Sequence, residues 1–590
     1  MRYFKRYRVS ERRVSGMGLL IGFTAMVSYN LLSSASVLAE EGMIRPVAVP
    51  KVIVSASVFT PQLGRHGLAD LTLHSSRSLC PAQTDQLCFP EQLQNLYASQ
   101  DFMPVWLDES LVEEFFLQLS ALAESDRVPG MMQRLLELKQ LRADRDSRGF
   151  DLLASDTYLV YQAVIAKMQR DPSSLYRSAA FQLTAQDSLS IPAFSLPVSM
   201  AQLQQLRPVE EKFQRLVAQM NALAQQAPHG VHLSGRPAIE FGDPIPRGEK
   251  LAKMLNVYGD LSDQDYTNLT SAQPEDAAAG IIRISDPYAN RGVLHEAIRR
   301  FQQRHGLQDD GIIGPATARN LTRSYQQVAQ LLALNMQRSR ALQRHDSGGV
   351  LQVNIPEFML RILDEDKVVF ESKVIVGRSQ RPTYLFSSAI NHMVVNPTWN
   401  VPETIKEEDV IPSLKRSPNY LAQHNMRMVS SWSDAGSIDP SQIDWSTVSA
   451  SNFPYEFQQR PGPSNALGQV KFMMPNDYSI YLHDTPAKRL FNRSKRDFSS
   501  GCVRVERAHD LANYLLERQR AGQSASYQNL LRKRTTATIN LRKTLAVDFI
   551  YRTAWLDDQG RLQIREDIYG YDDESSVPAE HDYIAMNRYR

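Results

Sequence analysis

The spacing of apolar residues changes a little past the middle of the chain, and this change constrains the fold more than any other feature. In segments 111–122 and 152–164 apolar residues recur three and four positions apart, which is typical of amphipathic helices. Segments 350–355, 358–363 and 368–376 are instead short apolar runs that predict strands. Helices followed by strands predict a multidomain α+β protein with a helical scaffold and a β-rich domain. In the helical part, carboxylates such as Glu113 and Glu114 are expected on solvated helix faces.

Length and charge limit the classes of protein. With 590 residues, the chain is expected to form three to five domains. Its 43% hydrophobic and 22% charged residues argue against wholesale disorder and against a polytopic membrane protein. The 66 Lys and Arg nearly balance the 64 Asp and Glu, and six of those basic residues lie within the first 39 positions. The remainder is slightly acidic, which argues against a nucleic-acid partner.

The first 39 residues have the pattern of a targeting segment. A basic stretch precedes residues 14–39, which carry no charge. The most apolar part, residues 17–32, is short for a bilayer span, and residues 37–39 resemble a peptidase site. We expect a cleaved secretory signal, with a retained inner-membrane anchor as the alternative. Either reading places the bulk of the chain outside the cytoplasm.

Three cysteines occur, so at least one thiol is unpaired in an oxidising compartment. Cys80 and Cys88 are eight positions apart and are expected to form a disulfide; two free thiols are the alternative. Cys502 is left alone, and a lone exported thiol is either buried and inert or kept for its reactivity.

A second unit is marked by an amphipathic helix over residues 294–302, an Asp309-Asp310-Gly311 turn, and a Gly314-Pro315 start to the next helix. These elements resemble the peptidoglycan-binding domain of cell-wall enzymes. Residues 247–255 are the candidate first helix, and 262–286 are interpreted as a polar insertion or flexible loop. A helical bundle with chance similarity is the alternative.

The sequence around Cys502 could support nucleophilic catalysis. A cysteine nucleophile needs a base, a group that orients the base, and donors for the oxyanion. His483 ends a predicted strand 19 positions before Cys502, and Gly501 lets the backbone pass close to a substrate. Taken singly, a histidine at a strand end and a cysteine after glycine are more often structural. The two together favour a catalytic pair.

The motifs His-Asp-Thr-Pro at 483–486 and Ser-Ser-Gly-Cys-Val-Arg at 499–504 resemble the L,D-transpeptidase family. Ser500 stands where most members have a second histidine. Segments 396–402, 444–447 and 461–463, together with Lys471-Phe472, are similar to the large periplasmic members of enteric bacteria, over most of residues 90–575. The resemblance implies a mainly-β YkuD-type catalytic sandwich with a capping insertion, a periplasmic location, and peptidoglycan stem peptides as substrate.

The family's reaction would be a 3→3 crosslink between diaminopimelate residues, made through a cysteine acyl-enzyme with release of D-alanine. Cys502 would be the nucleophile and His483 the general base and acid. The remaining candidates are the oxyanion donors, from the Gly501 and Cys502 amides and the Tyr481 hydroxyl, and the substrate-binding residues Arg504, Ser499, Ser500, Trp399 and Asn396. For Arg504 a structural ion pair, and for Trp399 a place in the core, are the alternatives.

Neither a cofactor nor a metal is expected, because His229 and His232 are the only close histidine pair. A carboxypeptidase that trims pentapeptides and a glycan polymerase are expected partners. Competing functions are an L,D-carboxypeptidase that uses water as acceptor, a non-catalytic wall-anchoring protein, and a zinc peptidase.

The expected domain order follows from these patterns. It is a signal or anchor (1–39), a helical scaffold (40–240), a small α-helical peptidoglycan-binding domain (241–325), a connecting helix (326–347), the catalytic domain (348–535) with its capping insertion (401–457), and a C-terminal β hairpin and tail (536–590).

Overall fold

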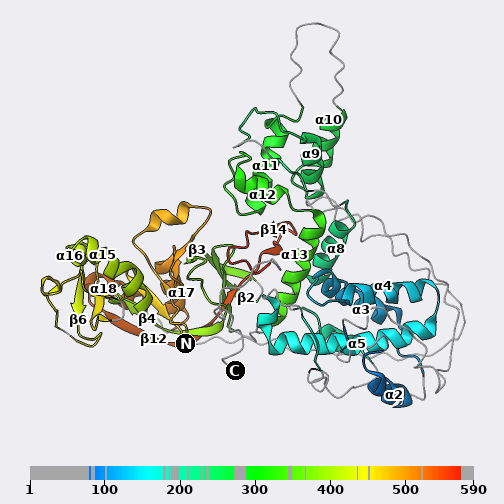
Figure 1. Cartoon of the computed structure of the whole chain (residues 1–590), viewed down its shortest axis with the longest axis horizontal. Coiled ribbons are helices and arrows are strands. Elements are labelled where there is room, and N and C mark those ends of the chain that lie inside the picture. The colour runs from blue at the N-terminus through cyan, green and yellow to red at the C-terminus, as the bar shows by residue number, and fades with distance from the viewer. Residues whose placement is uncertain are drawn as a thin grey trace, which may run out of the picture. The chain divides into compact units, whose positions relative to one another are not determined.

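The computed structural model describes residues 79–80, 87–99, 103–176, 181–184, 187, 198–208, 212–227, 230–233, 238–271, 287–342, 348–365, 367–434, 436–449, 452–519 and 523–572 (Figure 1). The expected signal or anchor segment, His229 and the last residues of the tail lie outside these ranges. Within them, no helix is both long and apolar enough to cross a membrane.

The scaffold is helical, as the apolar spacing predicts. Its helices are α2 (Pro90–Ser99), α3 (Glu109–Glu124), α4 (Met131–Ala143), α5 (Ser147–Arg170), η1 (Pro172–Leu175), α7 (Met200–Gln205) and α8 (Phe213–Ala224). Asp108 and Asp146 cap α3 and α5 by accepting backbone N–H bonds in the first turn. The prediction that Glu114 faces solvent is wrong: it is buried, because Arg207 pairs with it and Gln118 donates to it. Glu113 is exposed as predicted.

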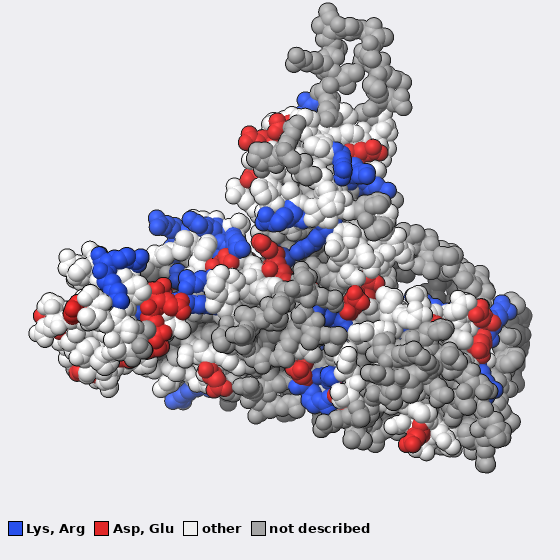
Figure 2. All heavy atoms as spheres, in the orientation of Figure 1, with Lys and Arg blue, Asp and Glu red and all other residues white. Residues whose placement is uncertain are grey.

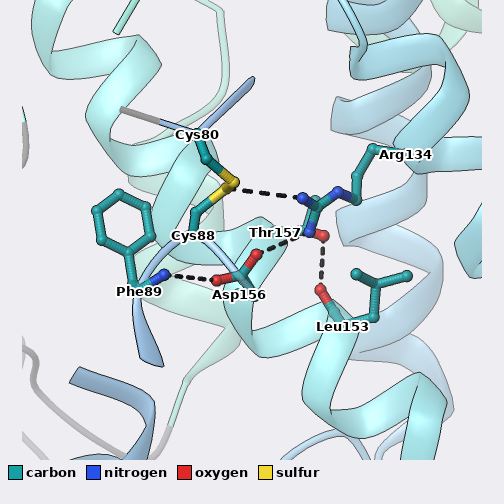
Figure 3. Close-up of a disulfide and its surroundings, with 7 residues drawn as sticks. All are labelled: Cys80, Cys88, Phe89, Arg134, Leu153, Asp156 and Thr157. Atoms are coloured by element: carbon teal, nitrogen blue, oxygen red, sulfur yellow. Dashed lines mark hydrogen bonds and ion pairs between the residues drawn. A yellow bond between two sulfur atoms is a disulfide. The ribbon is translucent and has the colours of Figure 1, made fainter. Parts of the chain in front are cut away.

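Cys80 and Cys88 form the expected disulfide, and a buried ion pair ties it to the helices (Figure 3). Arg134 on α4 lies 2.7 Å from Asp156 on α5, and its guanidinium also contacts Cys88 Sγ at 3.6 Å. Asp156 accepts a further bond from the Phe89 backbone N–H at 3.0 Å. The residues just before α2 therefore contact α4 and α5 through Arg134 and Asp156, in addition to their covalent connection.

The peptidoglycan-binding unit contains α9 (Gly248–Val257), α10 (Asp263–Ser271), α11 (Gly292–Arg304) and α12 (Pro315–Leu321). The predicted turn is present: Gly311 has φ +72°, and its N–H donates to the Gln302 side chain. Part of the predicted polar loop is helical, since α10 lies inside it. No residue of α10 is buried, so its polar composition reflects a solvated helix and does not exclude helical structure.

The predicted connecting helix is α13 (Tyr325–Arg338), which continues into η2 (Ser339–Ala341). It packs against α3 and α8 and is buried over most of its length. The strands β13 (Ala554–Leu556) and β14 (Leu562–Ile564) form a hairpin whose apolar side chains share one hydrophobic cluster with α8, α9, α11 and α13. This hairpin therefore helps to build the core of the peptidoglycan-binding unit.

The catalytic domain is mainly β, as predicted. Its sheet has the order β10-β3-β11-β9-β8-β4-β12-β1-β2, and β2 also pairs with β3, so hydrogen bonding closes on itself. The strands are β1 (Val350–Asn354), β2 (Met359–Asp364), β3 (Lys367–Gly377), β4 (Ser387–Val395), β8 (Val470–Met473), β9 (Leu482–His483), β10 (Asp497–Ser499), β11 (Val503–Val505) and β12 (Ala537–Ile550).

The C-terminal β hairpin predicted within residues 536–590 is present as β13 and β14, but β12 is not part of it. Strand β12 instead lies between β4 and β1, antiparallel to the first and parallel to the second. Pairing on both edges buries its apolar second half, which local alternation alone does not reveal. Helices α17 (Ala508–Glu517) and α18 (Gln523–Lys533) pack on each other, and α17 also contacts β8 and β12.

The insertion has its own small fold. Strands β5 (Trp399–Asn400), β7 (Glu456–Gln459) and β6 (Met426–Val429) form a separate sheet. The predicted charged helical turns are α14 (Glu403–Ile405), the π-helix η3 (Lys406–Val410) and α15 (Ile411–Arg416), followed by α16 (Tyr420–Gln423) and η4 (Pro440–Gln442). A hydrophobic cluster centred on Val401, Leu414, Met428 and Phe457 holds these pieces together. The insertion is thus a compact body with a core of its own.

Candidate active site

Two neighbouring parallel strands bring the predicted pair to one face of the sheet. Leu482 and His483 on β9 are in register with Val503 and Arg504 on β11. Leu482 and Val503 are fully buried in the core. Because side chains alternate along a strand, Tyr481, His483, Cys502 and Arg504 share the opposite face. We call this set, with Lys471 described next, the catalytic face.

Lys471 on β8 completes this face from the other side of β9. It is in register with His483, and its Nζ lies 5.3 Å from the centre of the Tyr481 ring. Lys471 belongs to a segment that resembles the L,D-transpeptidase family, but the sequence alone predicts no role for it. The alternation of residues 469–474 indicates this placement, because a strand with Phe472 in the core must turn Lys471 to the other face.

The Cys502 thiol is half-buried and bonds to the segment between β8 and β9. Its Sγ lies 3.6 Å from the Ser479 carbonyl oxygen, to which the thiol donates. Burial raises the pKa of this thiol, while hydrogen bonds from Tyr481 and the positive charges of Lys471 and Arg504 oppose that rise. The balance favours the protonated thiol, so catalysis requires a base.

His483 is buried and carries a fixed tautomer. Its Nδ1 lies 2.6 Å from the Asp484 carbonyl oxygen, which can only accept, so Nδ1 holds the proton and Nε2 keeps its lone pair. Burial, followed by the charge of Arg504, lowers the pKa of His483 to about 3. The imidazole is therefore neutral at neutral pH. Among the described contacts, no hydrogen bond joins His483 to Cys502.

Gly501 shapes the turn that presents the thiol. Its φ of +110° belongs to the left-handed region that favours glycine. The Gly501 N–H donates to Ser499 Oγ at 3.2 Å, and its carbonyl accepts from Thr383 Oγ1 at 2.7 Å. The predicted Gly501 donor is thus already engaged. For the Cys502 amide N–H, no acceptor is described among the residues that the structure covers.

Ser500 connects the thiol loop to the insertion. Arg381 Nη1 donates to Ser500 Oγ at 3.0 Å and lies 3.0 Å from Asp409 Oδ2. The same guanidinium pairs with Glu408, so two of the three carboxylates of η3 contact it. Ser500 therefore holds the arginine that links the insertion to the loop of Cys502.

Two predicted substrate-binding residues, Asn396 and Trp399, make contacts that hold parts of the domain together. Asn396 is buried, and its side-chain amide donates to the Leu530 carbonyl at the end of α18, 2.9 Å away. Its own N–H donates to Gln469 and its carbonyl accepts from Thr536, so all its polar groups fix β4 and α18. Trp399 packs half-buried against the hydrophobic cluster of the insertion. Asn396 thus holds elements of the catalytic domain together and Trp399 packs in the insertion, while their roles in substrate binding stay predictions.

Arg504 and Lys471 share an unusual property. No ion pair or hydrogen bond is described for either side chain, although both are partly buried. Two cations without carboxylate partners face the cysteine, so the catalytic face is prepared for an anionic ligand. In the described part of the chain, no group of three or more His, Cys, Asp or Glu could hold a metal ion.

Comparison with protein families identifies three parts of the chain. Residues 348–526 match the L,D-transpeptidase catalytic domain (YkuD), residues 91–220 match a scaffold domain, and residues 290–321 match the "Putative peptidoglycan binding domain". The β-rich part therefore matches an L,D-transpeptidase catalytic domain. It belongs to the YkuD type of L,D-transpeptidase catalytic domains, and a peptidoglycan-binding domain precedes it in the chain.

Individual relatives agree with this assignment. The chain is 38% identical over 263 residues to a Haemophilus influenzae protein named "Putative L,D-transpeptidase". That match covers 44% of this chain and 52% of the relative, so it spans about half the relative's length. A solved L,D-transpeptidase from Stackebrandtia nassauensis is 13% identical, with 55% of this chain and 97% of that one covered. Its TM-score of 0.19 is too low to carry an argument about the fold.

Proposed function

We propose that the chain is a peptidoglycan L,D-transpeptidase that forms 3→3 crosslinks through a Cys502 acyl-enzyme. The observation that carries the proposal is the catalytic face, which spans the neighbouring strands β11, β9 and β8. It holds a half-buried thiol, a neutral imidazole whose Nδ1 is bonded, and two cations for which no ion pair is described. Such a set suits attack on a carbonyl flanked by carboxylates.

In the first half-reaction, His483 Nε2 takes the thiol proton and Cys502 Sγ attacks the carbonyl between diaminopimelate and the terminal D-alanine. The tetrahedral intermediate collapses, the C–N bond breaks, and His483 gives its proton to the leaving amine of D-alanine. A thioester remains on Cys502. The low pKa of His483 makes it a reluctant base in the free protein and a strong acid toward the leaving amine.

Substrate charge would assist the base. Arg504 and Lys471 both lower the pKa of His483, and burial lowers it most. Carboxylates of a bound stem peptide would offset these two charges and make the imidazole a better base at the moment of attack. This explains why the cations are kept without internal partners.

The oxyanion has two donors in reach of the sulfur. The Cys502 amide has no acceptor among the described residues, and the Tyr481 hydroxyl hydrogen-bonds with Cys502. Gly501 contributes by fixing the turn, because its own N–H is held by Ser499. We therefore assign the oxyanion hole to Cys502 N–H and Tyr481.

In the second half-reaction, the side-chain amine of another stem's diaminopimelate attacks the thioester. His483 accepts the amine proton, the amide bond forms, the C–S bond breaks, and Cys502 is reprotonated. No ATP is needed, because the thioester keeps the free energy of the first peptide bond. Hydrolysis by water would instead make the protein an L,D-carboxypeptidase.

The insertion favours transfer over hydrolysis. It has its own hydrophobic core, and Arg381 fastens Glu408 and Asp409 of η3 to the loop that carries Cys502. A body fixed beside the thiol can order the donor stem and keep water from the thioester. We propose that the insertion caps the site, in a protein located in the periplasm and supplied by a carboxypeptidase and a glycan polymerase.

Mass spectrometry of muropeptides tests the proposal. Incubation of the full chain with disaccharide-tetrapeptides should give a crosslinked dimer and free D-alanine, whereas Cys502→Ala should give neither, nor a covalent adduct with a carbapenem. Arg381→Gln, which releases the insertion, should raise the share of hydrolysed tripeptide. An adduct on the intact mass of Cys502→Ala would contradict the nucleophile, and tripeptide as the main wild-type product would establish the carboxypeptidase.

A further inference from the structure

A hollow of about 620 Å³ lies away from the catalytic face, and four of its eleven lining residues are cationic while one, Asp309, is acidic. One wall is the loop of residues 491–498, between η6 (Lys488–Asn492) and β10, together with Lys373 of β3. The other wall is residues 307–309 of the peptidoglycan-binding domain. We call this hollow the basic pocket. Its cationic lining residues are Lys373, Arg493, Lys495 and Arg496.

Arg496 builds the floor of the basic pocket and keeps it positive. Its buried guanidinium donates to the carbonyls of Val374, Phe358, Arg493 and Ser494, at 3.2, 3.0, 2.6 and 3.4 Å. No carboxylate pairs with it among the described residues. The guanidinium therefore pins the loop to β2 and β3 while its charge stays unneutralised.

The side chains above this floor are exposed and basic. Arg489, Arg493 and Lys495 are exposed, and the Arg493 guanidinium stacks 5.5 Å from the centre of the Phe498 ring. Only Asp497 offsets them within the loop, 3.5 Å from Lys495. Figure 2 shows Lys and Arg gathered along the edge of the catalytic domain near this loop. Such a surface needs an anionic ligand, and Arg493 is suited to a bidentate carboxylate.

The basic pocket cannot hold the group that reacts at Cys502. Lys373 accepts a backbone bond from Glu506, just past the end of β11, whereas Cys502 precedes its first residue. Glu506 lies four residues after Cys502, which corresponds to about 13 Å of extended chain. Residues 307–309, which form the other wall, lie within the match to the peptidoglycan-binding domain. A polymer held by that domain would thus pass this pocket on its way to the catalytic face.

We propose that the basic pocket binds the carboxylates of a stem peptide on the peptidoglycan strand, at a position next to the reacting stem. The proposal rests on the proposed function for the identity of the polymer. Neutral sugars alone would gain little from four cations, whereas the stem peptides carry free carboxylates. The pocket would set the strand's register, so that one stem is anchored while its neighbour reaches Cys502.

The test compares sacculus binding by full-length chains that carry Cys502→Ala, so that no turnover intervenes. The pocket variant adds Arg493→Gln and Lys495→Gln, both exposed and away from the catalytic face. The matched control adds Arg532→Gln and Lys533→Gln on α18, which removes the same charge from the same domain. Intact sacculi, sacculi stripped of stem peptides by an amidase, and phosphatidylglycerol vesicles are the three probes.

We expect the pocket variant to bind intact sacculi about fivefold more weakly at low salt, and stripped sacculi and vesicles as well as its parent does. The control should match the parent on all three probes. Unchanged binding to intact sacculi, an equal loss in the control, or an equal loss on stripped sacculi would overturn the proposal. A loss confined to vesicles would overturn it in favour of a phosphate-bearing surface.

The proposed function fails separately from the pocket. Carbapenem acylation of Cys502, measured on the pocket variant with the cysteine restored, should equal that of the wild type. A wild type that never forms crosslinked dimer would refute the transpeptidase, and the sacculus result would still decide the pocket.

Discussion

Two regions of this protein bury charged groups, and they treat them in opposite ways. In the scaffold, Arg134 pairs with Asp156, and Asp151 accepts bonds from Tyr97, Val105 and Trp106. On the catalytic face, Arg504 and Lys471 have no described ion pair, and the imidazole of His483 and the thiol of Cys502 are not hydrogen-bonded to each other.

The difference separates structural from functional burial. A buried charge without a polar partner costs free energy, and in the scaffold Asp156 and Asp151 both have described partners. We propose that the catalytic face keeps this cost because a ligand supplies its partners. The experiments below either sharpen this contrast or break it.

The largest effect is expected at His483. His483→Gln should slow carbapenem acylation at pH 7 by about 10²- to 10⁴-fold, because no other group then takes the thiol proton. Since the pKa of His483 is lowered to about 3, the wild type should keep its imidazole neutral from pH 8 down to about 5 and lose that base only near pH 3. The residual rate of the variant should instead rise with pH as Cys502 ionises unaided.

Stopped-flow acylation between pH 5 and 9 measures both profiles. His232→Gln is the matched control, because His232 is exposed and lies outside the catalytic domain. Equal rates for His483→Gln and the wild type would show that another base acts.

A smaller effect, on stability alone, is expected in the scaffold. Asp156→Asn removes the described carboxylate partner of the buried Arg134 and should lower the free energy of unfolding by about 3–5 kcal/mol. Glu109→Gln breaks the more exposed pair with Arg142 in the same domain and should cost less than about 1 kcal/mol. Urea unfolding followed by circular dichroism compares them. Equal losses would erase the contrast between buried and exposed pairs, and a slower acylation of folded Asp156→Asn would contradict its purely structural role.

The smallest effect is expected at Lys471. Its charge lowers the pKa of the Cys502 thiol, so Lys471→Met should shift the midpoint of iodoacetamide alkylation upward by about 0.5–1 pH unit. Lys471→Arg should keep the wild-type midpoint, as should Lys533→Met on α18. A midpoint that stays in place in Lys471→Met would mean that the cation does not act on the sulfur.

The sequence predicted the class of protein because its informative residues are close together along the chain. Cys502, Gly501 and His483 stand within two short motifs, and the turn glycines of the peptidoglycan-binding unit lie within one run. Helix positions followed equally well from apolar spacing, as α3 and α5 show.

What the sequence did not predict depends on partners far away in the chain. Lys471 becomes a site residue only through its register with His483, and β12 becomes a central strand only through β4 and β1. Glu114 is buried because Arg207, 93 positions away, pairs with it. Asn396 stands in a segment that resembles the family, but its side-chain amide donates to a backbone carbonyl of α18. Such pairings leave no local pattern for a single sequence to show.

The position of β12 also governs how the protein can be made. The ribosome synthesises β12 after β4 and β1. The edges of these two strands stay uncovered until β12 pairs with them. Until then the catalytic domain offers two open edges, which are templates for aggregation. A chain truncated near residue 535 would keep Cys502 and every motif and still fail to assemble. Synthesis of Cys502 therefore precedes that of a strand on which its supporting sheet depends.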